Sequence, residues 1–212
     1  CQWVGCLPLR LELVGRYLAD DLDLSVQELL AELEETRLDA EALQAVEAGM
    51  TADLGVIQAL ELSWRELSGL ERDLACLLGM FAVAPIPWAL VEKCLAEVDA
   101  KNLRKARQNG LLHRSLLKRV DNNLYQLHQI VQEFFRAKLR QKPDQTNTIK
   151  SSFCEALVEV AQGIEESLTL VRAGIVREYI VHLEELGTRW VDSLANKDLV
   201  RLFVGLGRFH QG

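Results

Sequence analysis

The sequence LLKRVDNNLYQLHQIVQEFFRAKLR, at positions 116–140, contains the pattern that decides the fold. Two short apolar stretches, 116–120 and 124–127, flank Asp-Asn-Asn at 121–123. Because Asn and Asp tolerate a left-handed backbone, this pattern predicts a two-stranded β-hairpin. The residues that follow have apolar side chains at helical spacing, which predicts a helix over about 129–140.

Two helices are predicted upstream of the hairpin. Ser68 and Glu71 have the spacing of a capping box, in which each side chain accepts a hydrogen bond from a free backbone N–H. The helix that they begin runs to about Phe81. Pro85 and Pro87 then break the chain, and Pro87 suits the first turn of a second helix, because proline lacks an N–H there.

A third helix is predicted over 101–109, with Asp99 as its N-cap and Gly110 as the left-handed residue that ends it. Three helices, a two-stranded hairpin and a closing helix describe a winged helix-turn-helix. The sequence before and after these elements also predicts helices. Before them, Pro8 suits a helix start, and Ser25 with Glu28 forms a second capping box. We therefore predict a mainly α fold.

Charge is distributed unevenly along the chain, whose net charge is -7. Residues 1–70 hold 14 acidic and 4 basic residues, 71–142 hold 7 and 13, and 143–212 hold 10 and 7. A basic block between two acidic ones indicates parts with different surfaces. It favours either docking of the middle part on an acidic neighbour or a nucleic-acid surface.

Breaks in the helical pattern lie near the same places. Residues 48–55 are predicted to be a connector, and the polar stretch 141–152 is predicted to be a loop. We therefore predict a helical subdomain over 1–55, a winged-helix domain over 56–142 and a helical, repeat-like segment over 143–212. The last segment has the rhythm of helical hairpins without a complete repeat of fixed period.

Composition excludes several classes of protein. The 212 residues are 49% hydrophobic and 26% charged, which is typical of a globular chain. The longest apolar stretch, 77–91, is too short to cross a bilayer, so we expect no membrane partner. The five cysteines form no CxxC pair, which indicates a reducing cytoplasm with buried thiols rather than a disulfide framework or a metal site.

The segment GCLPLRL at 5–11 resembles the GLPLAL element of signal-transduction ATPases that contain an NB-ARC module (STAND ATPases). This family includes apoptotic-protease activators, plant disease-resistance proteins and many bacterial regulators. The segment YQLHQIVQEFF at 125–135 is similar to the family's MHD element, and LSW at 62–64 resembles the start of its winged helix. Residues 150–212 resemble the linker that leads into tetratricopeptide repeats.

This resemblance implies roles for two residues. Pro8 corresponds to the proline that packs against bound adenine, and His128 to the histidine that reaches the terminal phosphate of ADP. In the family, exchange of ADP for ATP breaks the second contact, the arms reorient and oligomers form. The resemblance also implies Mg²⁺ with the nucleotide, a nucleotide-binding domain in the same parent chain, and an effector or sensor protein bound by the C-terminal repeats.

The sequence departs from the family pattern in three ways. Gln129 replaces the usual Asp, and Arg10 replaces a usual Ala, a change that is tolerable if the side chain faces solvent. There is no GxxxxGK[ST] segment to bind phosphates. Because the chain begins with Cys1 rather than Met, we expect it to be a piece of a longer ATPase. The chain itself is expected to be a non-catalytic regulatory part that holds no cofactor tightly.

Two other functions stay open. The first is a DNA-binding winged helix, for which the candidate phosphate or interdomain contacts are the basic residues Lys101, Arg104, Lys105, Arg107, Arg114, Lys118 and Arg119. The acidic flanks and the negative net charge argue against nucleic acid as a partner. The second is a helical scaffold that binds proteins without any nucleotide.

Overall fold

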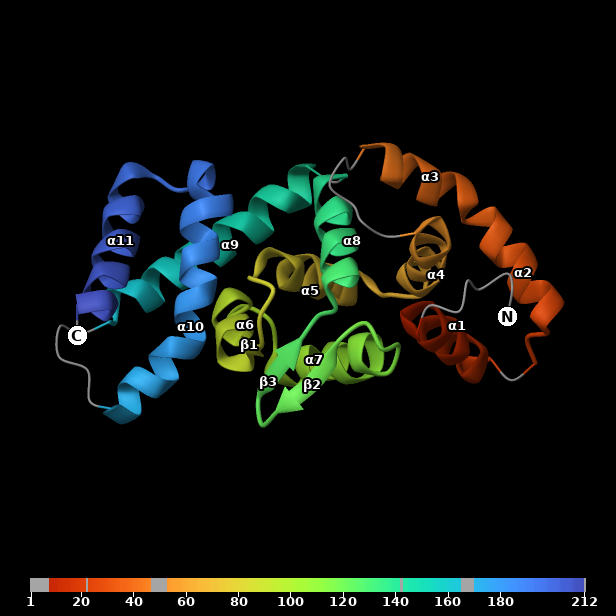
Figure 1. Ribbon diagram of the computed structural model, residues 1–212, viewed down its shortest axis with the longest axis horizontal. Coiled ribbons are helices and arrows are strands. Elements are labelled where there is room, and N and C mark those ends of the chain that lie inside the picture. Colours follow the sequence, from red (N-terminus) through yellow and green to blue (C-terminus); the bar gives the residue numbers. More distant parts are fainter. Residues whose placement is uncertain (1–7, 22, 47–52, 142, 165–169, 212) are drawn as a thin grey trace.

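The computed structural model describes residues 8–21, 23–46, 53–141, 143–164 and 170–211, which form eleven α-helices and one small antiparallel sheet (Figure 1). The mainly α fold class is confirmed. The predicted connector 48–55 lies largely outside the described residues, as does the Gly-Cys-Leu start of the GLPL-like element.

Four helices form the first part of the molecule, at the right of Figure 1. They are α1 (Pro8–Asp20), α2 (Val26–Glu35), α3 (Arg37–Val46) and α4 (Leu54–Arg65). The predicted capping box begins α2, where the backbone N–H of Glu28 donates to Ser25 Oγ and that of Ser25 donates to Glu28 Oε2. Helix α4 is buried along 55–64, because α1, α2, α3 and α8 all pack on it.

The middle part has the elements of a winged helix. They are α5 (Gly69–Met80), β1 (Ile86–Pro87), α6 (Trp88–Cys94), α7 (Ala100–Lys105), a π-helical turn (Ala106–Leu112), β2 (Lys118–Asp121), β3 (Leu124–Gln126) and α8 (Gln129–Arg140). The predicted hairpin is confirmed, with Asn123 in the left-handed region at φ 57°. A third strand, β1, was not predicted; it pairs with β3 on the side opposite β2.

The predicted end of the third helix is wrong. Asp99 caps α7 as expected, but the helix continues beyond 109 as the π-helical turn, and Gly110 lies buried inside that turn. A Cβ at Gly110 would lie 2.6 Å from Glu71 Cδ, so the glycine permits close packing on the start of α5. The left-handed residue that ends this segment is Ser115, at φ 56°.

Three helices form the last part, α9 (Pro143–Gln162), α10 (Leu170–Arg189) and α11 (Asn196–Gln211). The predicted loop 141–152 is wrong, because α9 begins at Pro143. Its polar sequence is helical since Ile149 and Phe153 are buried and the Thr146 hydroxyl donates to Leu139 O at the end of α8. None of the helices that the structure describes is long and apolar enough to span a membrane.

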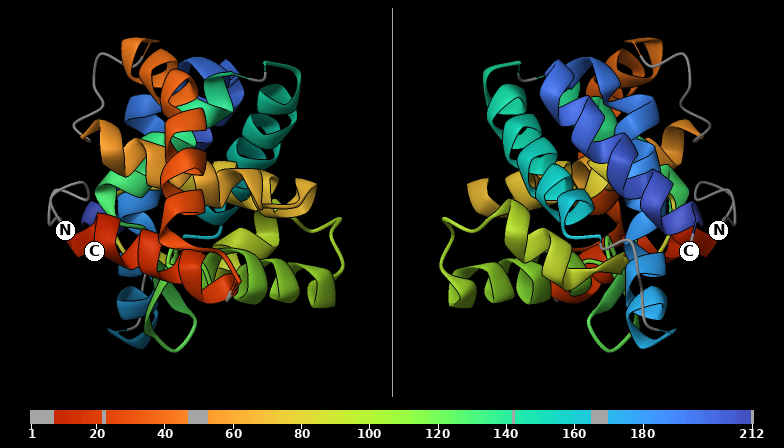
Figure 2. Two further views of the ribbon diagram at one scale, coloured as in Figure 1. Left: turned by 90° about the vertical axis from the view of Figure 1, so that its right-hand side faces the viewer. Right: turned by 90° about the vertical axis from the view of Figure 1, so that its left-hand side faces the viewer.

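Helices α9 and α11 lie side by side, as the right-hand view of Figure 2 shows. Gly205 on α11 makes the closest approach, since a Cβ there would lie 2.3 Å from the carbonyl oxygen of Ala161. A Cβ at Gly207, two residues further along α11, would meet nothing within 4 Å. The backbone contact at Gly205 therefore sets how closely the two helices pack.

We predict that Gly205→Ala lowers the free energy of unfolding by about 1–3 kcal/mol, because the methyl group would collide with rigid backbone. The matched control is Gly207→Ala, which should stabilise the protein by about 0.5–1 kcal/mol through helix propensity alone. Urea unfolding measures both values. Equal stability of the two variants would contradict the packing described here.

Candidate functional site

The hairpin formed by β2 and β3 is the wing of the winged helix. A groove of about 680 Å³ separates α1 from this wing, and we call it the α1–wing groove. It collects residues from α1, the loop after α5, the end of the π-helical turn, β2 and the start of α8. Its lining residues are Leu9, Glu12, Arg16, Val83, Leu112, Ser115, Leu116, Leu117, Lys118, Arg119, Gln126, Leu127, His128 and Gln129. Leucine side chains therefore form much of its surface, and basic side chains and a histidine add polar groups.

Both residues that the family resemblance singles out lie at this groove or beside it. Pro8 is exposed at the first position of α1 and is not among the lining residues, but its neighbour Leu9 is. His128 lines the groove from the start of α8. The fold thus brings two sequence elements close together that are about 120 residues apart.

His128 is the N-cap of α8. Its Nδ1 accepts a hydrogen bond from the backbone N–H of Ile130 at 3.2 Å. In a neutral imidazole with Nδ1 as acceptor, Nε2 carries the proton. The ring can therefore donate a hydrogen bond through Nε2 without losing its cap, whereas protonation of Nδ1 would break the cap.

Two departures from the family pattern have clear positions. The Gln129 side chain lines the groove and donates to Glu133 Oε1 at 3.0 Å. Arg10 does not face solvent but is buried, with its guanidinium above Gly55 at the start of α4 and 3.9 Å from Asp53. A glycine at position 55 makes this possible, because any Cβ there would lie 2.1 Å from Arg10 Cζ.

The structure separates the basic residues proposed as phosphate or interdomain contacts. Lys101, Arg104 and Lys105 are exposed on α7, whereas Lys118 and Arg119 line the groove. The other two hold the fold together. The guanidinium carbon of Arg107 lies 4.3 Å from the Trp88 ring centre and 4.8 Å from that of Tyr125, and Arg114 binds Asp20 on α1. The seven residues therefore do not form one basic surface.

Asp20 connects α1 to the winged helix. It accepts a hydrogen bond from Arg114 Nη1 at 2.7 Å and lies 3.2 Å from His113 Nδ1. Beside it, burial and a hydrogen bond with Glu32 raise the pKa of Tyr17. Sequence analysis named Arg114 as a candidate phosphate or interdomain contact but missed its partner Asp20, which is 94 residues away and belongs to no motif.

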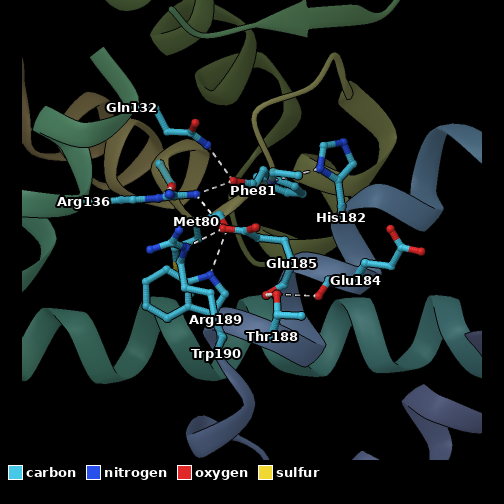
Figure 3. A network of polar contacts seen from close by, with 12 residues as sticks. Met80, Phe81, Gln132, Arg136, His182, Glu184, Glu185, Thr188, Arg189 and Trp190 are labelled. Carbon is cyan, nitrogen blue, oxygen red and sulfur yellow. Dashed lines mark hydrogen bonds and ion pairs between the residues drawn. The ribbon is translucent and has the colours of Figure 1, made fainter. Parts of the chain in front are cut away.

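The carbonyl groups at the end of α5 accept hydrogen bonds from distant side chains (Figure 3). Arg136 Nε donates to Gly79 O at 2.6 Å and its Nη2 donates to Phe81 O at 2.8 Å. Gln132 Nε2 also donates to Phe81 O, and Trp190 Nε1 donates to Met80 O. These bonds join α5, α8 and α10 around one helix end.

His182 holds the loop that follows. The backbone N–H of Ala82 donates to His182 Nδ1 at 3.2 Å, and Nε2–H donates to Pro85 O at 3.1 Å. Burial lowers the pKa of His182 to about 4, so the ring is neutral. Val83, which lines the α1–wing groove, lies within this loop.

No catalytic group was identified in the sequence, and the thiols that the structure describes are unsuited to nucleophilic chemistry. Cys76, Cys94 and Cys154 are buried free thiols. Burial raises the pKa of Cys94 to about 12 and that of Cys154 to about 11, so both are protonated at neutral pH. Within the described ranges, no cluster of His, Cys, Asp and Glu could hold a metal ion.

Comparisons of the chain with models of protein families, with curated proteins and with solved structures found no match.

The buried histidine predicts a pH dependence of stability. Between pH 6.5 and about 4, the unfolded chain takes up a proton at His182 that the folded protein does not. The stabilising contribution of neutral His182 is therefore complete above pH 6.5 and is lost as the pH falls towards 4, by at most about 3 kcal/mol.

Urea unfolding at several pH values tests this expectation. His182→Gln removes the titrating group, so the free energy of unfolding of the variant should fall less steeply than that of the wild type between pH 6.5 and 5. Parallel pH profiles of the two proteins would show that His182 does not titrate as described.

Proposed function

We propose that the chain is the helical and winged-helix arm of a nucleotide-regulated switch related to the NB-ARC ATPases. In this proposal a P-loop domain holds the nucleotide, and the α1–wing groove receives the part of it that faces the arm. The observation that carries the proposal is that Leu9, beside Pro8, and His128 line a single groove. Because of this groove, one ligand could contact both of the sequence elements that resemble the family.

The dimensions and chemistry of the groove support this role. Small-molecule sites are typically about 300–1,000 Å³ and mainly apolar, with a few placed polar groups. The groove has about 680 Å³, leucine side chains from three segments and a histidine that can donate through Nε2. A hydrogen bond from an imidazole to a phosphate is stronger than one between neutral groups.

Switching would follow from a difference in ligand contacts. A ligand shifts an equilibrium between two conformations only if it binds them differently. A phosphate within reach of His128 would favour the arrangement in which the wing faces the nucleotide domain, and its displacement would remove that preference. The arm would then reorient and make surfaces available for oligomerisation.

The last part of the chain supports a second element of the proposal. Helix α11 exposes Val200, Phe203 and Val204 on one face, a pattern typical of helical protein-interaction surfaces. We propose that this part binds an effector or sensor protein. We also place the switch in the cytoplasm, in keeping with the free thiols of the described cysteines.

DNA binding is less well supported. Arg107 lies over the Trp88 and Tyr125 rings and Arg114 binds Asp20, so two of the seven candidate phosphate contacts are engaged inside the molecule. The remaining basic residues lie in two separate places, on α7 and in the groove.

The proposal predicts that His128→Ala speeds ADP release about tenfold in the protein in which this chain is joined to its P-loop domain. The substitution also removes the cap of α8 and should cost about 1 kcal/mol of stability. His128→Asn is the matched control, because Asn is a good N-cap but has no imidazole. Release of a fluorescent ADP analogue measures the rates.

Both variants should release ADP faster, and only the alanine variant should be less stable. If His128→Asn retains ADP as long as the wild type, the role proposed for His128 is wrong.

A further inference from the structure

Two basic side chains that line the α1–wing groove from different elements have no counter-ion among the described residues. Arg16 lines the groove from α1, and Lys118 lines it from β2. Neither has an ion-pair partner among the residues that the structure describes. The groove contains one acidic lining residue, Glu12, against Arg16, Lys118 and Arg119.

The other basic residues of this region are engaged. Arg114 binds Asp20, and Arg107 stacks on Trp88. Arg119 donates to Asn122 Oδ1 at 2.7 Å and to Asp121 O at 3.3 Å, which orients its guanidinium within the wing. Arg16 and Lys118 therefore differ from their neighbours in having no such partner within the described ranges, although both line the same groove.

Their placement has an electrostatic consequence. Like charges that line a concave surface with apolar walls add their fields and attract anions. An anion between α1 and β2 would relieve the repulsion between the two sides. A phosphate group matches this arrangement because several of its oxygens can accept hydrogen bonds from different donors at once.

We propose that Arg16 and Lys118 are phosphate-binding residues of the α1–wing groove, so that a phosphorylated ligand joins α1 to the wing. This inference rests on the proposed function for the identity of the ligand, a nucleoside diphosphate. Leucine side chains in the same groove, among them Leu9 and Leu127, provide apolar surface beside the phosphate contacts. Neither basic residue belongs to the sequence elements that suggested the family.

The α1 side of the groove is already joined to the winged helix by an ion pair. Arg16 lies on the same helix as Asp20, whose bridge to Arg114 already ties α1 to the winged helix. The ligand would add a second tie across the groove. Loss of either basic residue should therefore weaken ligand binding and leave the Asp20 bridge in place.

The test uses the 212-residue chain labelled with ¹⁵N and followed by NMR at low ionic strength. Inorganic pyrophosphate, ADP and adenosine are the probes. Pyrophosphate and ADP should shift the amide signals of groove residues with dissociation constants on the order of millimolar, and adenosine should bind more weakly. Added salt should weaken the binding of both phosphorylated probes.

Arg16→Gln and Lys118→Gln should each weaken pyrophosphate and ADP binding about threefold to tenfold. Lys101→Gln is the matched control, because Lys101 is exposed on α7 and does not line the groove. It should leave both dissociation constants unchanged.

The proposal is overturned if pyrophosphate shifts no groove signal, or if the two glutamine variants bind it as the wild type does. Stronger binding of a short DNA duplex through α7 would also overturn it in favour of nucleic acid. These results leave the proposed function standing if His128→Asn still speeds ADP release in the joined protein. If His128→Asn releases ADP at the wild-type rate but the chain still binds pyrophosphate through Arg16 and Lys118, the proposed nucleotide switch is wrong and the proposed anion site is retained.

Discussion

The carbonyl groups at the end of α5 are the constraint on which the arrangement of the molecule depends. The last carbonyls of a helix lack partners within the helix, and burying them unpaired is costly. Here Arg136 and Gln132 on α8 and Trp190 after α10 provide those partners. Arg136 also binds Glu185 on α10 at 2.8 Å, so one guanidinium connects three helices. Because α8 begins beside His128, the same bonds position the candidate nucleotide contact.

The elements that could be predicted from sequence are those whose cause is local. The Asp-Asn-Asn turn and both capping boxes lie within a few residues of the structure that they determine. The strand β1, the π-helical turn at Gly110 and the start of α9 could not be predicted, because each depends on a distant partner. Ile86 pairs with Tyr125, Gly110 packs on Glu71, and Thr146 binds the end of α8.

The residues of the candidate site likewise divide into those that sequence could predict and those that depend on distant partners. Its histidine could be singled out because a family resemblance attaches to the end of the hairpin, and the hairpin has a clear sequence signal. Arg16 and Val83 carry no such signal, since their importance comes from the other residues of the groove, and Asp20 carries none because its partner Arg114 is distant in the sequence. A basic residue near a predicted helix end could not be distinguished from an ordinary solvated one until β2 was placed opposite α1.

Helix α4 has a mechanical consequence for any such switch. Its residues 55–64 are all buried, and Glu61 forms an ion pair with Lys138 of α8 at 2.5 Å. Sliding α4 along α8 would separate that buried pair, which is strongly unfavourable. In the proposed switch α4 and α8 would therefore move as one body, so that any reorientation of α1 has to change the contacts of α1 with that pair of helices.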